Sequence, residues 1–139
     1  MAATTGTRLG TPMVQLWAPR MLSVLRFVTG LMFMEHGMSK LFGIPAPFPG
    51  GGPAPFTLLW VAGILETFGG LLVALGLFTR PAAFVLSGEM AIGYWMIHAP
   101  KSLFPLLNGG DAAVLYCFVF LYLFVAGGGV WSVDRFLRR

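Results

Sequence analysis

Four long apolar runs, separated by short segments rich in proline, glycine or charge, dominate the pattern of the chain. They cover roughly Met21–Phe42, Phe56–Phe78, Ala82–His98 and Ala112–Trp131. About 20 helical residues, each rising about 1.5 Å, cross the hydrocarbon core of a bilayer. Three runs reach that length, and the third is short. Because backbone groups in lipid must be satisfied within their own segment, the runs predict helices rather than strands.

The segments between the runs carry turn and capping signals. Thr79-Arg80-Pro81 predicts a helix start, with a capping hydroxyl followed by a proline near the first helical position. Asn108-Gly109-Gly110-Asp111 predicts a turn followed by a capping carboxylate for the last helix. The uncharged, proline-rich link 43–55 cannot be helical, and we expect it to pack over the mouth of the bundle. Prolines within residues 1–20 argue against a regular helix there.

Composition identifies the solvent of these helices. The 139 residues are 57% hydrophobic and 10% charged, and the mean hydropathy is +0.81. Soluble domains have about a quarter of their residues charged, and so small a domain has little interior in which to bury the excess. The bilayer is therefore the expected partner. The net charge of +4 comes from sparse cations near helix ends, which argues against nucleic acid. The single cysteine, Cys117, excludes an intramolecular disulfide or a CxxC motif.

The cations also predict an orientation. One predicted side carries six arginines and the other carries two lysines, Lys40 and Lys101. Because cytoplasmic loops collect Lys and Arg, both termini are expected inside. The fold class is thus an all-α integral membrane four-helix bundle, N-in/C-in, of the bacterial inner membrane. It divides into a cytoplasmic segment 1–20, a transmembrane domain 21–134 and a basic tail 135–139.

Five ionisable side chains fall inside the apolar runs. An ionisable residue at bilayer depth costs several kcal/mol unless it is paired or wetted, and is a candidate functional residue. The five are Arg26, Glu35, His36, Glu66 and Glu89. Helical spacing puts Arg26 and Lys40 on one face of the first helix and Glu35 on the opposite side. The same spacing puts Glu66 on a glycine-rich face of the second helix.

Depth and charge suggest roles for these residues. Arg26 and Glu89 have opposite charges and similar predicted distances from the cytoplasmic boundary, so we expect an ion pair, either structural or functional. His36 adjoins Glu35 and precedes Lys40 by one turn. Since convergent titratable groups in an apolar setting are typical of a binding site, we assign ligand binding to Glu35, His36 and Glu66.

The remaining polar groups of the outer side are Lys40, His98 and Asp111. His98 ends its helix beside Pro100, which favours an interfacial cap. A bis-histidine haem between His36 and His98 is a less favoured alternative, and no metal site is predicted.

Several of these residues form an ordered pattern that resembles the DoxX family of small four-helix bacterial membrane proteins. The likeness covers roughly 22–134, although relatives often carry Glu in place of Asp111. It rests on Arg26…Gly30…Phe33-Met34-Glu35-His36-Gly37…Lys40-Leu41, Glu66…Gly69-Gly70…Leu75-Gly76-Leu77…Thr79-Arg80, Tyr94…His98, Asn108-Gly109-Gly110-Asp111 and Gly127…Gly129…Ser132…Asp134. The family is named for a subunit associated with a thiosulfate:quinone oxidoreductase, so the resemblance implies a membrane subunit of a redox complex that contacts quinone. It does not by itself establish catalysis.

Three functional hypotheses follow. The first is a redox-associated subunit that binds quinone or another lipid-soluble ring near Glu35, His36 and Glu66, with a partner supplying electrons. The chain predicts no cofactor of its own beyond this possible quinone. The second is a non-catalytic anchor or accessory subunit that packs among other membrane or redox subunits, or against copies of itself. The third is a small proton-coupled transporter. The sequence leaves open whether the chain is an enzyme.

Overall fold

The computed structural model describes residues 12–138, which form helices and connecting loops without a strand. The first helix is α1 (Pro12–Phe42). The second is one continuous rod made of α2 (Leu58–Ile64), a π-helical turn η1 (Leu65–Gly69) and α3 (Gly70–Leu75). The third joins α4 (Thr79–Gly93) to a second π-helical turn, η2 (Tyr94–His98). A short α5 (Pro105–Asn108) leads to α6 (Asp111–Ala126), and α7 (Val133–Leu137) ends the fold.

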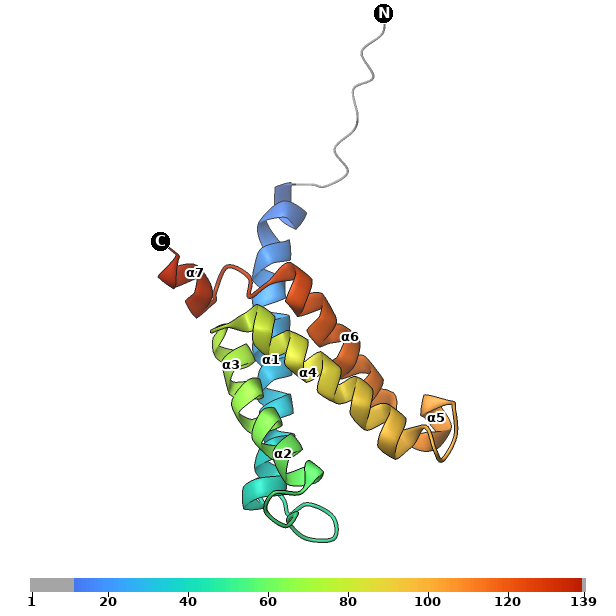
Figure 1. Cartoon of the computed structure of the whole chain (residues 1–139). Helices are drawn as coiled ribbons and strands as arrows, with labels where there is room; N and C mark the ends of the chain where they lie inside the picture. Colours follow the sequence, from blue (N-terminus) through green and yellow to red (C-terminus); the bar gives the residue numbers. More distant parts are fainter. Residues whose placement is uncertain (1–11, 139) are drawn as a thin grey trace, which may run out of the picture.

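The long helices form two pairs. The α2–η1–α3 rod lies along α1, and α6 lies along α4. Figure 1 shows the two pairs crossing near the α3–α4 turn, with α5 at the far end of the second pair. Their shared core is apolar and consists of Phe33, Val73, Ala83, Leu86, Phe120 and Leu123. Within it the rings of Phe33 and Phe120, 4.8 Å apart and edge to face, join α1 to α6.

Glycines allow α1 and the second helix to approach closely. A Cβ atom on Gly30 would fall on the backbone nitrogen of Ala74, and one on Gly70 would lie 2.7 Å from the backbone nitrogen of Met34. The face predicted from helical spacing is therefore the face that packs. Small residues at such positions let two backbones meet where larger side chains would separate them.

A buried arginine ties three parts of the chain together. Arg26 is 3% exposed, and its guanidinium donates to four backbone carbonyls. Nη1 donates to Val73, at 2.6 Å, and to Ala74, both in α3. Nε donates to Gly128, at 2.8 Å, and Nη2 donates to Trp131, at 2.7 Å. The last two lie in the loop after α6, so one side chain fastens α1, α3 and that loop.

Asp134 caps α4 from a distance in sequence. Its two carboxylate oxygens accept hydrogen bonds from the backbone N–H groups of Phe78 and Thr79, both at 2.8 Å. The Thr79 hydroxyl was predicted to cap this helix, but Phe78 occupies the cap position and offers no side-chain hydrogen bond. Partial burial raises the pKa of Asp134, but the hydrogen bonds from Thr79 and Phe78 outweigh it and hold the pKa below its usual range.

Several predicted helix ends and caps differ from those in the structure. The first helix begins at Pro12, because a proline at the first helical position costs no hydrogen bond, and it continues through Pro19 in its interior. The last long helix ends at Ala126 rather than Trp131, because Gly127 (φ 84°) and Gly129 (φ 78°) turn the chain back towards α1. Asp111 is the first residue of α6 and does not cap it, since the cap position belongs to Gly110. Residues 1–11 of the predicted cytoplasmic segment 1–20 lie outside the described residues.

The proline-rich link is non-helical, as predicted, and it folds back over the end of α1. The Ser39 hydroxyl donates to the carbonyl of Ala46 at 2.8 Å. The Phe48 ring lies with its centroid 5.9 Å from the Lys40 ammonium. The link therefore covers the end of α1 that carries Lys40.

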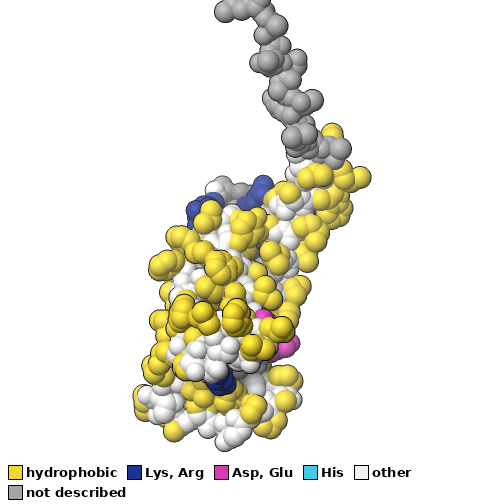
Figure 2. All heavy atoms as spheres, turned by 90° about the vertical axis from the view of Figure 1, so that its right-hand side faces the viewer, with side chains coloured by type: hydrophobic (Ala, Val, Ile, Leu, Met, Phe, Trp, Pro, Cys, Tyr) yellow, Lys and Arg dark blue, Asp and Glu magenta, His cyan; other side chains and the backbone are white. Residues whose placement is uncertain are grey.

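The surface of the fold is strongly apolar. Figure 2 shows hydrophobic side chains over most of one face, Lys and Arg gathered mainly towards the upper end, and a small acidic patch partway along. By length and composition, one helix of the described residues, Leu58–Leu75, qualifies to cross a membrane, and Asp111–Ala126 is a shorter apolar helix. A four-helix transmembrane arrangement with both termini inside stays a prediction.

The glycine seam can be tested with two substitutions of the same type. Gly30→Ala adds a methyl group against the backbone of Ala74, whereas a Cβ on Gly88 has nothing within 4 Å. We expect Gly30→Ala to lower the free energy of unfolding by about 1–3 kcal/mol, because the two helices must separate. Gly88→Ala is expected to raise it by up to about 1 kcal/mol through helix propensity. Reversible unfolding in mixed micelles measures both, and equal effects would contradict a tight seam at Gly30.

Candidate functional site

An ion pair crosses the seam between the first two helices. Lys40 Nζ lies 2.5 Å from Glu66 Oε1, and the side chains are 12% and 4% exposed. It is the one salt bridge between side chains of residues 12–138. Glu66 lies in the π-helical turn η1, a local widening that occurs often at functional sites. A buried ion pair is stable only when its charged groups are in close contact, and the distance of 2.5 Å between Nζ and Oε1 meets this condition.

Unpartnered polar atoms lie beside this pair. Glu66 Oε2, both carboxylate oxygens of Glu89 and the Tyr116 hydroxyl are buried without a hydrogen-bond partner among the described residues. Buried polar atoms are nearly always bonded, so a group of unsatisfied ones calls for an explanation such as a ligand, an ion or water. The charge of Glu66 acts on both Glu89 and Tyr116, which puts the three in one neighbourhood.

His36 borders the same neighbourhood. Its Nδ1 lies 2.8 Å from the carbonyl oxygen of Met32, which can only accept, so Nδ1 carries the proton. Nε2 is then free to accept a proton or a hydrogen bond. The imidazole meets the Tyr116 ring edge to face, at 5.8 Å between centroids. We call Lys40, Glu66, Glu89, Tyr116 and His36 the central cluster.

Each long helix contributes to the central cluster. Lys40 and His36 come from α1, Glu66 from η1, Glu89 from α4 and Tyr116 from α6. The cluster therefore exists only when the two helix pairs are assembled. It combines a cation, two carboxyl groups, a phenol and an imidazole within apolar surroundings, so it can donate and accept hydrogen bonds and can transfer protons.

The predicted ligand-binding residues are only partly brought together. Glu66 and His36 belong to the central cluster. Glu35 is exposed on the other side of α1, although its charge still acts on Tyr116. Glu35 therefore lies outside the central cluster, with its carboxylate exposed on the surface of the protein.

The predicted ion pair between Arg26 and Glu89 is wrong. The Arg26 guanidinium is held by backbone carbonyls of Val73, Ala74, Gly128 and Trp131, and both carboxylate oxygens of Glu89 are unpartnered. The reason is depth. Arg26 lies at the level of the α3 end, whereas Glu89 is ten residues beyond Thr79 along α4, or about 15 Å further at the helical rise.

His98 belongs to a separate set of interactions at the α5 end. Its Nδ1 lies 3.1 Å from the carbonyl oxygen of Asn108, and its ring stacks on Tyr94 at 6.2 Å. The Asn108 amide donates to the carbonyl of Ser102 at 2.7 Å, and its oxygen accepts from the N–H of Gly110 at the same distance. His98 therefore links the end of η2 to α5, whereas the prediction made it a cap of its own helix.

Sequence reasoning missed two participants. Tyr116 stands in the long apolar run Ala112–Trp131, and no role was predicted for its hydroxyl. Asn108 was recognised only as a turn residue. A phenol five residues into an apolar helix was the available signal for Tyr116, since its hydroxyl needs a partner wherever it is buried.

A helical fold with an apolar surface and an ionisable cluster between its helices defines a membrane protein with a polar interior site. The sequence profile of the DoxX family matches residues 21–99, and this chain belongs to the DoxX family.

Three relatives extend this identification. An uncharacterised protein of Haemophilus influenzae is 41% identical over 128 residues, which cover 88% of this chain and 96% of the relative. The Bacillus subtilis protein named "Putative oxidoreductase CatD" is 30% identical, over 84% of this chain and 86% of its own length. The Escherichia coli inner membrane protein YphA is 29% identical, over 84% and 90%. The name of the YphA relative supports a membrane location for the chain. No solved structure matches it.

The Lys40–Glu66 pair can be tested by a double-mutant cycle. Lys40→Met leaves the buried Glu66 carboxylate without its cation, and we expect the free energy of unfolding to fall by about 3–5 kcal/mol. Adding Glu66→Gln should recover more than half of this loss. The exposed Lys101 provides the matched control, since Lys101→Met should change stability by less than about 0.5 kcal/mol. Strictly additive losses for Lys40→Met and Glu66→Gln would show that the pair has no role.

Proposed function

We propose that this chain is a multi-pass membrane subunit of a redox-associated complex, and that its central cluster binds the carbonyl groups of a quinone or a similar lipid-soluble ring. All four long helices cross the inner membrane in this proposal, with both termini in the cytoplasm.

The observation that carries the proposal is the set of unsatisfied buried polar atoms. Glu66 Oε2, both Glu89 oxygens and the Tyr116 hydroxyl come from three helices and have no partner within residues 12–138. A quinone carbonyl accepts a hydrogen bond from a phenol, and the hydroxyl groups of its reduced form donate to carboxyl groups. One ligand thereby satisfies groups that the fold leaves open.

The surroundings of the cluster suit a flat apolar ring. The Phe33 and Tyr116 rings are 5.0 Å apart and tilted, and Tyr116 is stacked with Phe120 at 5.9 Å. Aromatic faces attract such rings through offset or edge-to-face contacts. The exposed side of His36 gives the cluster a border with the lipid phase, from which a lipid-soluble ligand arrives.

In this proposal, this chain exchanges protons with the bound quinone and a partner protein supplies the electrons. Reduction of a quinone to a quinol consumes two electrons and two protons, and converts two carbonyl groups to hydroxyls. A redox protein in contact with this subunit supplies the electrons. His36 Nε2 and the carboxyl oxygens of Glu66 and Glu89 are the groups of this chain that can give or take up these protons beside the ring. The name of the CatD relative supports a redox role.

Ring binding can be measured with a pair of identical substitutions in α6. Tyr116→Phe removes the buried hydroxyl, while Tyr122→Phe removes an exposed one. With the full chain in lipid nanodiscs titrated with a short-chain ubiquinone or menaquinone analogue, we expect Tyr116→Phe to weaken binding about 3- to 10-fold, the worth of one hydrogen bond. Tyr122→Phe should bind as the wild type does.

Two outcomes would contradict the proposal. The first is saturable binding that Tyr116→Phe and Glu89→Gln leave unchanged, which places the ring elsewhere. The second is no saturable binding by the folded wild type. If the chain then copurifies with membrane subunits, the anchor hypothesis replaces the proposal. If reconstituted vesicles show proton-linked flux, the transporter hypothesis does.

A further inference from the structure

A second polar site lies at the opposite end of the fold from Lys40. A cavity of about 350 Å³ opens between the loop after α6, the start of α4 and α7. Its walls include residues 126–130, the aliphatic Leu22 and four charged side chains, namely Arg80, Asp134, Arg135 and Arg138. Pockets of about 300–1,000 Å³ are typical of small-molecule sites.

The charge of this cavity is positive and is only partly compensated by Asp134. Arg80, Arg135 and Arg138 make no side-chain salt bridge with any residue of the described range. Asp134 is the one carboxylate in the wall, and both of its oxygens accept hydrogen bonds from the backbone of Phe78 and Thr79. With three guanidinium groups and one carboxylate, the cavity carries a net charge of +2.

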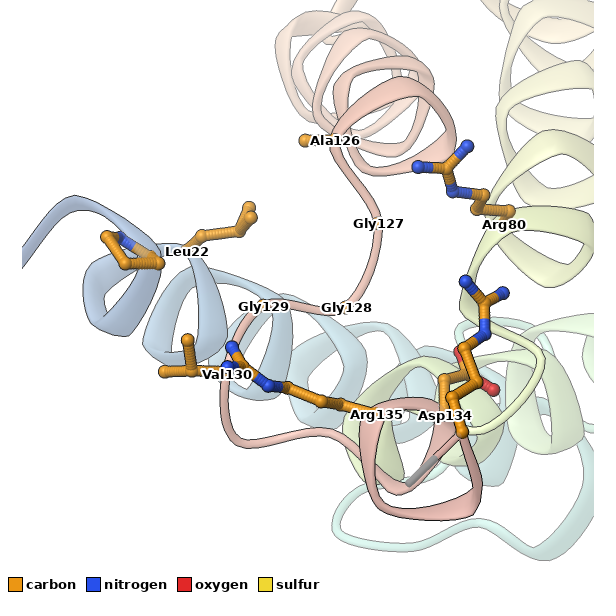
Figure 3. A pocket seen from close by; sticks show the side chains of 11 residues that line it. Leu22, Arg80, Ala126, Gly127, Gly128, Gly129, Val130, Asp134 and Arg135 are labelled. Carbon is orange, nitrogen blue, oxygen red and sulfur yellow. The ribbon is translucent and has the colours of Figure 1, made fainter.

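The backbone around the cavity admits the guanidinium groups. A Cβ on Gly127 would lie 3.4 Å from Arg80 Nε, an ordinary van der Waals distance, so the Arg80 side chain lies directly beside this loop. Figure 3 shows Arg80 reaching towards Gly127 and Ala126, and Arg135 reaching towards Val130 at the other end of the same loop. Two arginines from different helices thus lie at opposite ends of one glycine loop that lines the cavity.

We propose that this cavity binds an anionic phosphate group. Guanidinium forks match the oxygens of a phosphate in pairs, and several arginines around one cavity favour a phosphate over a single carboxylate. The phosphate belongs either to the headgroup of an anionic phospholipid or to a free phosphate ion. If it belongs to a lipid, the apolar wall formed by Leu22 and Val130 accommodates aliphatic atoms next to the headgroup. This proposal does not depend on ring binding by the central cluster.

The test compares three arginines in the full chain by native mass spectrometry from detergent. The ligands are a short-chain phosphatidylglycerol, the matching phosphatidylcholine and inorganic phosphate. Arg80→Gln and Arg135→Gln should each weaken phosphatidylglycerol binding about tenfold or more, the expected loss for hydrogen bonds to a charged group. Arg20→Gln is the control, because Arg20 carries the same charge outside the cavity, where it donates to the carbonyl of Leu16. It should change binding less than twofold.

The outcomes distinguish a lipid headgroup from a free phosphate, and they also include results that would overturn the proposal. Phosphatidylglycerol binding that inorganic phosphate does not displace assigns a lipid headgroup, and efficient displacement assigns a free phosphate. Equal weakening by Arg20→Gln, Arg80→Gln and Arg135→Gln would reduce the effect to general charge attraction and overturn the proposal. Equally tight binding of phosphatidylcholine would also overturn it. Unchanged thermal unfolding of the variants shows that they are folded.

Discussion

A single buried guanidinium holds together parts of this chain that lie far apart in sequence. Arg26 donates to the carbonyls of Val73 and Ala74 in the last turn of α3, where helix geometry leaves carbonyl oxygens short of donors; Val73 also accepts from the N–H of Gly76 at 3.0 Å. The negative end of the helix dipole also favours a cation there. The same group donates to Gly128 and Trp131. The charge therefore needs no carboxylate, because backbone dipoles and the fork of the side chain together compensate for the loss of water.

The rest of this end of the fold is shaped around that group. A Cβ on Gly76 would lie 2.9 Å from Arg26 Cζ, so the turn after α3 needs glycine both for its positive φ and for the space that the guanidinium occupies. The loop 127–132 returns to α1 because Arg26 and Ser23 bind its backbone. Asp134 then caps α4. With these connections made at one end, the groups of the central cluster that have no hydrogen-bond partner, Glu66 and Glu89 among them, lie about 10–15 Å away along the helix axes.

Much of this arrangement follows from the sequence, and the exceptions share a cause. Helical spacing predicted the packed faces that contain Gly30 and Glu66, and the proline-rich link was correctly predicted to be non-helical. The partners of Arg26 were missed because every residue has a carbonyl, so such acceptors leave no mark in a sequence. The Asp134 cap was missed because it joins positions 55 and 56 residues apart. Of the central cluster, His36 and Glu66 were named from the sequence as candidate binding residues. The place of Tyr116 in the cluster depends on which face of α6 packs inward, and a uniformly apolar run does not specify that face.

The most direct test of this account is hydrogen–deuterium exchange of Arg26→Lys alongside the wild type. Lysine keeps the charge but lacks the planar fork that reaches several carbonyls at once. We predict a loss of protection concentrated in residues 73–78 and 127–134, with a fall in the free energy of unfolding of more than about 2 kcal/mol, because several charge-assisted hydrogen bonds are lost. Wild-type protection in both segments and unchanged stability would contradict the claim that the guanidinium fork, rather than a positive charge alone, holds the fold together.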